Sequence, residues 1–233
     1  MADKLKIYVG YDSREDIAWQ VCRHSIRRHA SSKVGIYPLK QKVLRQLGLY
    51  TRSADNATTE FSITRFLTPY LAAHDGYSIF VDCDFLFTDD VMKIFDGLDR
   101  SKALHVVHHD YTPANAIKMD GKAQTTYPRK NWSSFMLFNG AHPDVKALTP
   151  QVVNSAEPAF LHRFNWTSDD QIGELDLTWN FLEGEYPKPD ETPTCIHYTN
   201  GGPWFDDWQN VDYGDEWRAE RDMYEARRAQ AAE

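Results

Sequence analysis

The sequence has few cysteines, no long apolar run and no extended basic tract. Its three cysteines, Cys22, Cys83 and Cys195, lie far apart, and an odd number cannot form a complete disulfide framework. No stretch approaches the roughly 20 apolar residues that span a bilayer. The N-terminus passes from two charged residues into a short apolar strand, without the apolar segment of a signal peptide. We therefore expect a cytoplasmic protein without a transmembrane segment.

The charge balance argues against a nucleic-acid-binding protein. The formal net charge is −8 and the runs of Lys and Arg are short, whereas proteins that hold nucleic acid neutralise its phosphates with basic side chains. A small phosphorylated ligand remains compatible with this charge if a metal ion concentrates positive charge at one point. We thus expect no nucleic acid among the partners of this chain.

Length and composition predict one core. Hydrophobic residues make up 42% and aromatic residues 13% of the 233 positions, and no Gly-, Ser- or Pro-rich linker divides them. We expect one folded domain over residues 1–205 and a charged amphipathic tail over residues 206–233. The tail carries more acidic than basic residues, unlike a membrane-docking helix, so we expect it to pack on its own domain or on a partner subunit of a homo-oligomer.

Apolar runs alternate with helical patterns along the chain, which predicts an α/β sheet. The expected strands are 5–10, 34–39, 77–81, 103–107, 134–138 and 194–198. The expected helices are one capped by Ser13, one over 60–76, one over 143–155, a short one over 170–175 capped by Asp169, and a terminal one over 215–228, and 46–59 is expected to be a surface loop. Ligands of such sheets bind beyond the carboxyl ends of the strands.

Two carboxylates follow the apolar run at 77–81. In an extended chain Asp82 and Asp84 project to the same side, while Cys83 points away into the core. Two neighbouring carboxylates repel each other unless a cation lies between them, and hard oxygen ligands suit Mg²⁺ or Mn²⁺. The alternative is that one aspartate caps a turn and the other is solvated. Their position at the edge of a core favours the metal site.

Around these carboxylates the chain resembles retaining glycosyltransferases of the GT-A fold, the group of glycogenin and the bacterial lipooligosaccharide galactosyltransferases. The matching segments, in order, are the opening strand with Tyr11 and Asp12, then 64–66, 80–84, 133–139, 169–171, 177–182 and 196–204. The resemblance covers most of the chain up to about Trp204. It implies a Rossmann-like GT-A catalytic domain whose mixed, mostly parallel sheet is flanked by helices.

The resemblance also implies an activity. The chain would be a metal-dependent hexosyltransferase that passes a sugar from a nucleotide sugar to a glycan or another hydroxyl acceptor, with retention. Asp82, Asp84 and His197 would hold Mn²⁺ or Mg²⁺ together with the diphosphate, and an imidazole ligand favours Mn²⁺. The alternative for His197 is a hydrogen-bonded histidine at a strand end. The residues expected at the nucleotide are Tyr11, Asp12, Arg65, Asp82, Cys83, Gly201, Gly202 and Trp204.

By the same resemblance, Tyr11 would stack on the base and Asp12 would accept the N3–H of uracil, which favours a UDP-sugar. Alternatively, Tyr11 is a packing aromatic and Asp12 is the cap of the following helix. Arg65 would reach the ribose or a phosphate, or would lie on a solvated helix face.

At the glycines near its C-terminus the chain differs from the related group. Gly201 and Gly202 would let backbone N–H groups approach phosphate oxygens, and Trp204 would exclude water. The group usually has a lysine just before its Pro-Trp pair, where this chain has Gly202. Stabilisation of the leaving group would then come from the metal, from backbone amides, or from Arg14 or Arg65.

Asp170 and Gln171 resemble the segment that lies beside the anomeric carbon in the group, which implies catalytic roles for both residues. Trp132 is either a platform for the acceptor sugar or a core residue. The cluster of His105, His108, His109 and Asp110 is expected to consist of strand and loop residues near the acceptor.

Two other functions remain open from the sequence. A haloacid-dehalogenase-type phosphatase also places two spaced aspartates after an apolar strand and uses Mg²⁺. Its motif, however, usually opens the chain and continues with a small residue where this chain has Leu86. The other alternative is an inactive domain that binds a sugar nucleotide without turnover, which the missing lysine favours.

Overall fold

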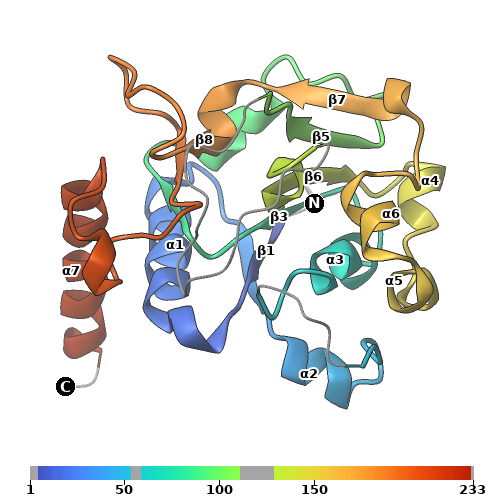
Figure 1. The fold of residues 1–233 in the computed structure, drawn as a ribbon, viewed down its shortest axis with the longest axis horizontal. Coiled ribbons are helices and arrows are strands. Elements are labelled where there is room, and N and C mark those ends of the chain that lie inside the picture. The colour runs from blue at the N-terminus through green and yellow to red at the C-terminus, as the bar shows by residue number, and fades with distance from the viewer. Residues whose placement is uncertain (1–4, 54–58, 111–128, 232–233) are drawn as a thin grey trace.

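The computed structural model describes residues 5–53, 59–110 and 129–231. A six-stranded sheet of order β2-β1-β3-β6-β5-β7 forms its centre (Figure 1). The strands are β1 (Lys6–Gly10), β2 (Gly35–Leu39), β3 (Tyr77–Val81), β5 (Leu104–Val107), β6 (Phe135–Asn139) and β7 (Ile172–Leu175). β6 runs antiparallel to both of its neighbours, and the remaining pairs are parallel. The predicted mixed, mostly parallel sheet is confirmed.

A small second sheet stands at the carboxyl end of β3. It consists of β4 (Phe85–Phe87), β8 (Phe181–Leu182) and β9 (Cys195–His197), in the order β4-β9-β8. The chain passes from β3 to β4 through Asp82, Cys83 and Asp84, so these residues join the two sheets. Because Phe85 is paired with His197 in the β4–β9 ladder, His197 lies beside Asp84.

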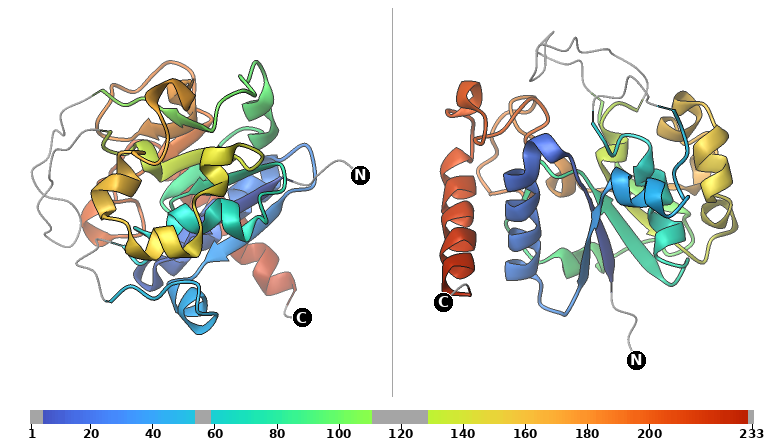
Figure 2. Two further views of the ribbon diagram at one scale, coloured as in Figure 1. Left: turned by 90° about the vertical axis from the view of Figure 1, so that its right-hand side faces the viewer. Right: turned by 90° about the horizontal axis from the view of Figure 1, so that it is seen from below.

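Helices cover both faces of the large sheet (Figure 2). They are α1 (Asp16–His29), α2 (Gln41–Gln46), α3 (Thr68–Leu71), α4 (Pro143–Lys146), α5 (Pro150–Ser155), α6 (Pro158–His162) and α7 (Gly214–Gln230). α1 and α7 lie on one face, and α3 to α6 on the other. Within the described residues, every helix is too short or too polar to cross a membrane.

The first helix begins differently from the prediction. Asp12, not Ser13, caps the short 3-10 turn Ser13–Glu15 that leads into α1: its carboxylate accepts a hydrogen bond from the Arg14 backbone N–H (3.0 Å). Glu15, at the N-cap of α1 itself, makes no side-chain capping bond. Asp12 has the extended backbone that an N-cap requires. Ser13 already lies in the turn, and its hydroxyl donates to Glu60 instead.

Two predicted helices are interrupted. The helix expected over 143–155 forms as α4 and α5, because Pro150 lacks the N–H that a continuous helix needs and restricts the residue before it. Thr149 caps the new start by accepting from the Val152 N–H (3.3 Å). The helix expected over 60–76 shortens to a 3-10 turn, Thr64–Leu67, followed by α3.

The short helix predicted over 170–175 is wrong. Asp169–Gln171 form a 3-10 turn in which Asp169 is not the cap, and the next residues form β7, which pairs with β5. Hydrogen bonding to β5 outweighs the weak local preference for a helix. In the expected 46–59 loop, residues 47–53 are turn and coil, although Tyr50 is buried; residues 54–58 lie outside the described residues.

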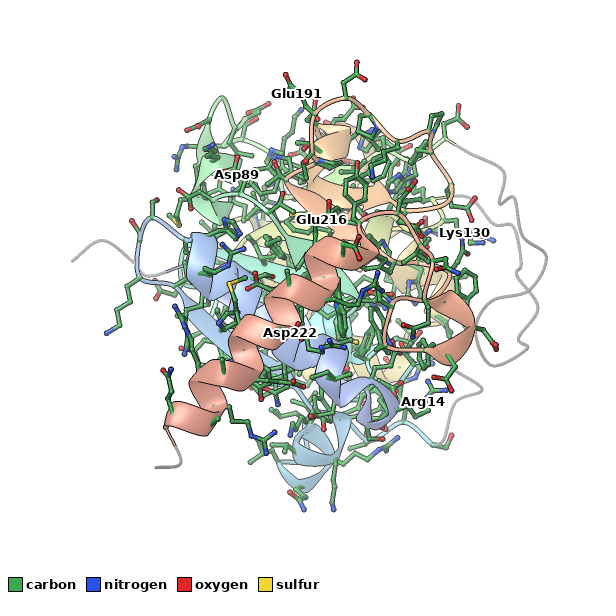
Figure 3. The ribbon with its side chains drawn as sticks, turned by 90° about the vertical axis from the view of Figure 1, so that its left-hand side faces the viewer. Arg14, Asp89, Lys130, Glu191, Glu216 and Asp222 are labelled. Atoms are coloured by element: carbon green, nitrogen blue, oxygen red, sulfur yellow. The ribbon has the colours of Figure 1, made fainter. Side chains whose placement is uncertain are left out.

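The terminal helix is confirmed as α7 and packs on α1, as Figure 3 shows from the side of α7. Trp217 is 1% exposed and joins a cluster with Val21 of α1. Glu220 is also 1% exposed, and its carboxylate contacts His24 Nδ1 (2.5 Å) and accepts from Arg28 Nε (2.8 Å). The acidic tail therefore includes a buried carboxylate that is paired with two basic groups of α1.

Removal of the Glu220 carboxylate is expected to destabilise the fold. Glu220→Ala leaves the buried His24 without its acceptor and the partly exposed Arg28 without its ion pair, which costs about 2 kcal/mol. Urea denaturation would measure the free energy of unfolding. Glu225→Ala, which removes an exposed carboxylate from the same helix, should change it by less than about 0.5 kcal/mol. Equal effects of the two substitutions would show that the buried pair adds nothing.

Candidate metal and nucleotide site

Asp82, Asp84 and His197 meet where the two sheets join. One ligand atom from each residue lies within 4.8 Å of those of the other two. The Nε2 atom of His197 is 3.4 Å from Asp84 Oδ2. The structure thus brings together the three residues that the sequence predicts as metal ligands.

Backbone hydrogen bonds fix the two carboxylates in place. The Asp82 N–H donates to the carbonyl of Ser134 (2.9 Å), and the Tyr198 N–H donates to the carbonyl of Asp84 (3.0 Å). The side chain of Cys83 points into the core and is 1% exposed. Burial raises the pKa of this thiol well above its usual value, so Cys83 contributes its backbone position and not a thiolate ligand.

The donor set fits a divalent cation. Asp84 is 9% exposed, and its Oδ1 atom is buried without a hydrogen-bond partner. A buried carboxylate oxygen of this kind is costly unless a charge or a donor satisfies it. Two carboxylates and one imidazole match the ligand preference of Mn²⁺ and of related ions better than that of Mg²⁺ or Ca²⁺.

Asn180 determines which nitrogen of His197 is available. The Nδ2 amide of Asn180 donates to Ser134 Oγ (2.9 Å) and to the carbonyl of Asn131 (3.3 Å), so its Oδ1 is the acceptor facing His197 Nδ1 (2.9 Å). His197 Nδ1 therefore carries a proton, which leaves Nε2, the nitrogen nearer Asp84, as the one that can bind a metal. Phe85 stacks on the imidazole with ring centres 4.3 Å apart. This arrangement favours the ligand interpretation of His197.

Arg65 lies in the core and not on a solvated helix face. Its side chain is buried, and its Nη1 atom donates to the carbonyl of Ser133 (2.7 Å) and lies 3.1 Å from Asp82 Oδ1. The guanidinium also lies over the rings of Phe61 and Phe80. Arg65 is therefore a fixed positive charge beside Asp82, and the solvated-face alternative is wrong.

Asp12 has the capping role that the sequence left open. It is fully buried; its Oδ1 accepts from Arg14 Nε (2.9 Å), and its Oδ2 accepts from the Glu60 N–H (3.2 Å). Burial alone would raise the pKa of Asp12, but the bonds from Arg14 and Glu60 outweigh it and lower the pKa. Both oxygens are thus engaged within the protein, and Arg14 is directed at Asp12.

Tyr11 is half-buried at the end of β1. Its hydroxyl donates to Asp16 Oδ1 (2.9 Å), and the Lys40 ammonium lies 4.1 Å from the centre of its ring. Stacking of this ring on a nucleotide base stays a prediction.

The two glycines accommodate tryptophans. A Cβ atom on Gly202 would lie 1.9 Å from the ring of Trp204, and one on Gly201 would lie 2.7 Å from Trp208. Gly201 also has φ +144°, a conformation that other residues rarely adopt. Trp204 itself packs against Trp217 of α7. A side chain at position 202, such as the lysine of the related group, would collide with Trp204 where it lies here.

Asp170 and Gln171 do not join the cluster. The carbonyl of Gln171 accepts from the Ala103 N–H at the start of β5, whereas Asp82 follows the last residue of β3, a strand that runs in the same direction. The two residues therefore lie at the opposite end of the strands from Asp82. Asp170 is exposed there, and its Oδ2 accepts from Gln171 (2.9 Å). The catalytic roles expected for them are not supported.

Trp132 and the histidines expected near the acceptor do not form a single cluster. His108 stacks on Trp132 with ring centres 4.2 Å apart, and the indole N–H of Trp132 donates to the carbonyl of His109 (2.9 Å). His105 is buried against Gly173 of β7, and Asp110 is exposed. Trp132 is half-buried, so the acceptor platform stays a prediction.

Two side chains near the cluster were missed from the sequence. Asn180 could have been found as a polar residue between the apolar Trp179 and Phe181, since a buried amide needs a specific partner. Glu15 gave no such signal. It is 2% exposed, its Oε2 has no hydrogen-bond partner, and burial, with the charges of Asp84 and Asp12, raises its pKa to about 8.

Comparison with known proteins identifies a close relative. No profile of a known protein family matches the chain. Protein CDI of Arabidopsis thaliana is 49% identical over 224 residues, which are 94% of this chain and 86% of Protein CDI. The chain belongs to the Protein CDI family.

Solved structures show the fold of this CDI-family chain. It matches the bifunctional glycosyltransferase WbbM with a TM-score of 0.62 and 16% identity, over 95% of this chain and 50% of WbbM. It matches GlyE of Streptococcus pneumoniae TIGR4 with 0.61 and 14%, over 94% and 60%. The galactosyltransferase LgtC, solved with donor and acceptor sugar analogs, gives 0.60 and 11%, over 94% and 96%. The predicted GT-A fold is confirmed, in a chain that spans about half of WbbM and 60% of GlyE.

In this CDI-family chain we expect Asn180→Ala to lower the affinity for Mn²⁺ by about 10- to 100-fold, because His197 loses the acceptor that fixes its ring and its proton. Mn²⁺ binding would be measured by electron paramagnetic resonance. Asn139→Ala is the matched control. Asn139 is the last residue of β6, away from the cluster, so this substitution should leave the affinity for Mn²⁺ unchanged. An unchanged affinity in Asn180→Ala would show that His197 needs no such support.

Glu15 should make stability depend on pH. Its pKa is raised from 4.5 to about 8 in the folded chain, so the unfolded chain releases this proton first and stability falls as the pH rises from about 5 to about 8. In chelator, Glu15→Gln should lack this part of the loss, on the order of 3 kcal/mol. Thermal unfolding of both proteins across this range would measure it, and parallel curves would contradict it.

Proposed function

We propose that this chain is a metal-dependent glycosyltransferase that transfers a hexose from a UDP-sugar to a glycan or another hydroxyl acceptor, with retention. The observation that carries the proposal is the cluster of Asp82, Asp84 and His197 at the carboxyl end of β3. Open α/β sheets bind their ligands beyond the carboxyl ends of the strands. The fold shared with WbbM, GlyE and LgtC supports the same class of reaction.

Each residue of the site has a distinct part in this proposal. Asp82, Asp84 and His197 hold the cation, and Asn180 keeps His197 Nε2 directed at it. Arg65 fixes the Asp82 carboxylate from the core side. A bound Mn²⁺ would neutralise the charge that develops on the departing diphosphate.

The position of Asp170 and Gln171 supports a mechanism without a nucleophile from this segment. Both residues lie at the opposite end of the strands from Asp82, so neither is assigned as the nucleophile or as a stabilising group at the sugar. Attack of the acceptor hydroxyl from the face that the diphosphate leaves gives retention without a carboxylate nucleophile from the protein. We propose this same-face route. The acceptor hydroxyl passes its proton to the departing phosphate oxygen.

The chain's cysteines fit a reducing compartment. Cys22, Cys83 and Cys195 are all free thiols and all buried. We propose that the protein acts in the cytoplasm, where such thiols stay reduced and where nucleotide sugars would be its soluble partners.

A second candidate function is a domain that binds a sugar nucleotide without turnover. It is favoured by Gly202, which stands where the related group has its diphosphate-binding lysine and which cannot carry a side chain beside Trp204. The remoteness of Asp170 and Gln171 favours it as well. A phosphatase of the haloacid dehalogenase type is disfavoured, since the two aspartates follow β3 and not an opening strand.

Binding calorimetry with UDP, GDP, CDP and ADP, each with Mn²⁺ and again with chelator, tests the proposal. We expect UDP to bind only with Mn²⁺, and Asp84→Asn to weaken that binding by at least about 100-fold, because it removes a ligand charge. Asp99→Asn, which changes an exposed carboxylate away from the cluster, is the matched control. If no nucleotide binds under any condition, the proposal fails.

Release of free sugar from UDP-sugars in the absence of acceptor separates the two candidates. Slow hydrolysis that requires Mn²⁺ and Asp84 supports the enzyme, while tight binding of UDP-sugars without any turnover supports the binding domain.

A further inference from the structure

The ends of three neighbouring strands place a lysine, a tyrosine and the metal cluster in one row. β1 pairs in parallel with β2 on one side and with β3 on the other. Lys40 directly follows β2, Tyr11 follows β1, and Asp82 follows β3. Neighbouring strands lie about 4.8 Å apart, so the row extends over two strand spacings, roughly 10 Å. This length is comparable to that of a nucleoside.

Lys40 covers one face of the Tyr11 ring. Its ammonium lies 4.1 Å from the ring centre, so a base could stack on that face only if the ammonium moved away. The ring itself is held in place, because the Tyr11 hydroxyl donates to Asp16 Oδ1 (2.9 Å). Within the part of the chain that the structure describes, the Lys40 ammonium forms no ion pair with a carboxylate.

The backbone of Lys40 is fixed, whereas its ammonium is carried on a flexible stem. The Lys40 carbonyl accepts hydrogen bonds from the N–H groups of Val43 (3.1 Å) and Leu44 (3.1 Å) at the start of α2. A lysine side chain has a flexible four-carbon stem and rotatable donors. The ammonium can therefore move from the Tyr11 ring to an acceptor nearby without a change in the fold.

Asp12, which the sequence suggested as the residue that reads the base, has no acceptor capacity left. Its Oδ1 accepts from the Arg14 N–H (3.0 Å) and Arg14 Nε (2.9 Å), and its Oδ2 accepts from Arg14 Nη2 (2.8 Å) and the Glu60 N–H (3.2 Å). A carboxylate offers about four acceptor positions, and the side chain is fully buried. Recognition of a base at Tyr11 therefore falls to another side chain, and Lys40 is the one whose donors lie at the ring.

An ammonium distinguishes bases by what they carry at the 4-position of a pyrimidine. It has three hydrogen-bond donors and no acceptor. Uracil has a carbonyl oxygen, O4, at the place where cytosine has an amino group, which is itself a donor. A lysine directed at this position therefore bonds to uracil and finds no acceptor on cytosine.

We propose that Lys40 selects the base of the nucleotide sugar. The base stacks on Tyr11 in place of the ammonium, and the ammonium then donates a hydrogen bond to O4 of uracil. The nucleotide follows the row of strand ends, from the diphosphate at Asp82 and Asp84 to the base at Tyr11. This inference rests on the proposed binding of a nucleotide sugar, and it gives Lys40 the role that was expected of Asp12.

Binding calorimetry of the full chain with UDP and with CDP, both in the presence of Mn²⁺, tests the proposal. We expect the wild type to bind UDP at least about tenfold more tightly than CDP, because a hydrogen bond from a charged donor is worth about one factor of ten or more. Lys40→Met keeps the apolar stem and loses the donors, so this preference for UDP should fall by about tenfold. Lys40→Arg keeps a cationic donor and should retain a preference for UDP.

Two further variants serve as controls. Lys42→Met removes an exposed lysine of α2, two residues further along the chain, and should leave both affinities unchanged. Tyr11→Leu removes the ring and should weaken UDP and CDP alike, by about tenfold, because every base can stack on an aromatic ring. All variants should keep the circular dichroism spectrum of the wild type.

Two results would overturn the inference and leave the proposed function intact. One is equal binding of UDP and CDP by the wild type. The other is an equal loss of affinity for both nucleotides in Lys40→Met, which would show that Lys40 attracts the phosphates and does not read the base. If UDP does not bind in the presence of Mn²⁺, the proposed function itself fails, and the role of Lys40 fails with it.

Discussion

The repulsion between Asp82 and Asp84 is the constraint around which the site is built. Both carboxylates stand where β3 ends and β4 begins, and both are largely buried, with side-chain exposures of 13% for Asp82 and 11% for Asp84. Arg65 lies against Asp82 from the core side, and His197 lies against Asp84 from β9. One buried oxygen of Asp84 still has no hydrogen-bond partner. The fold thus reduces the repulsion without removing it, which leaves a site whose most favourable occupant is a cation.

Glu15 would add to this repulsion if it were ionised. Its carboxyl is buried near Asp84 and Asp12, and burial together with these charges raises its pKa to about 8, which favours the protonated form near pH 7. A protonated carboxyl is a hydrogen-bond donor, which an ionised one is not. Loss of that proton would add a third negative charge at the start of α1. Such buried groups lower the stability of the folded state and are retained where a site needs them.

Apolar runs in the sequence predicted β1, β2, β3, β5, β6 and β9 but not β4, β7 and β8, and the grouping of Asp82, Asp84 and His197 was expected from the resemblance. An apolar run followed by spaced aspartates fixes where β3 ends, and β9 then brings His197 across. The helix predicted over 143–155 is interrupted at Pro150. The proline was visible in the sequence, but the helical spacing of the apolar residues favoured one continuous helix. Asp170 and Gln171 failed for another reason: likeness to a motif does not say at which end of the strands a segment will lie. That depends on the pairing of β7 with β5, which is a long-range contact.

The residues after Trp204 pack against the elements that carry the site. Trp204 contacts Tyr198, next to His197, and packs on Trp217 of α7, while Gly202 leaves room for its ring. Trp204 and Tyr198 thus connect α7 with the end of the strand that carries His197. The first turns of the acidic tail, which was expected from composition alone, pack against the small sheet and help to support the cluster.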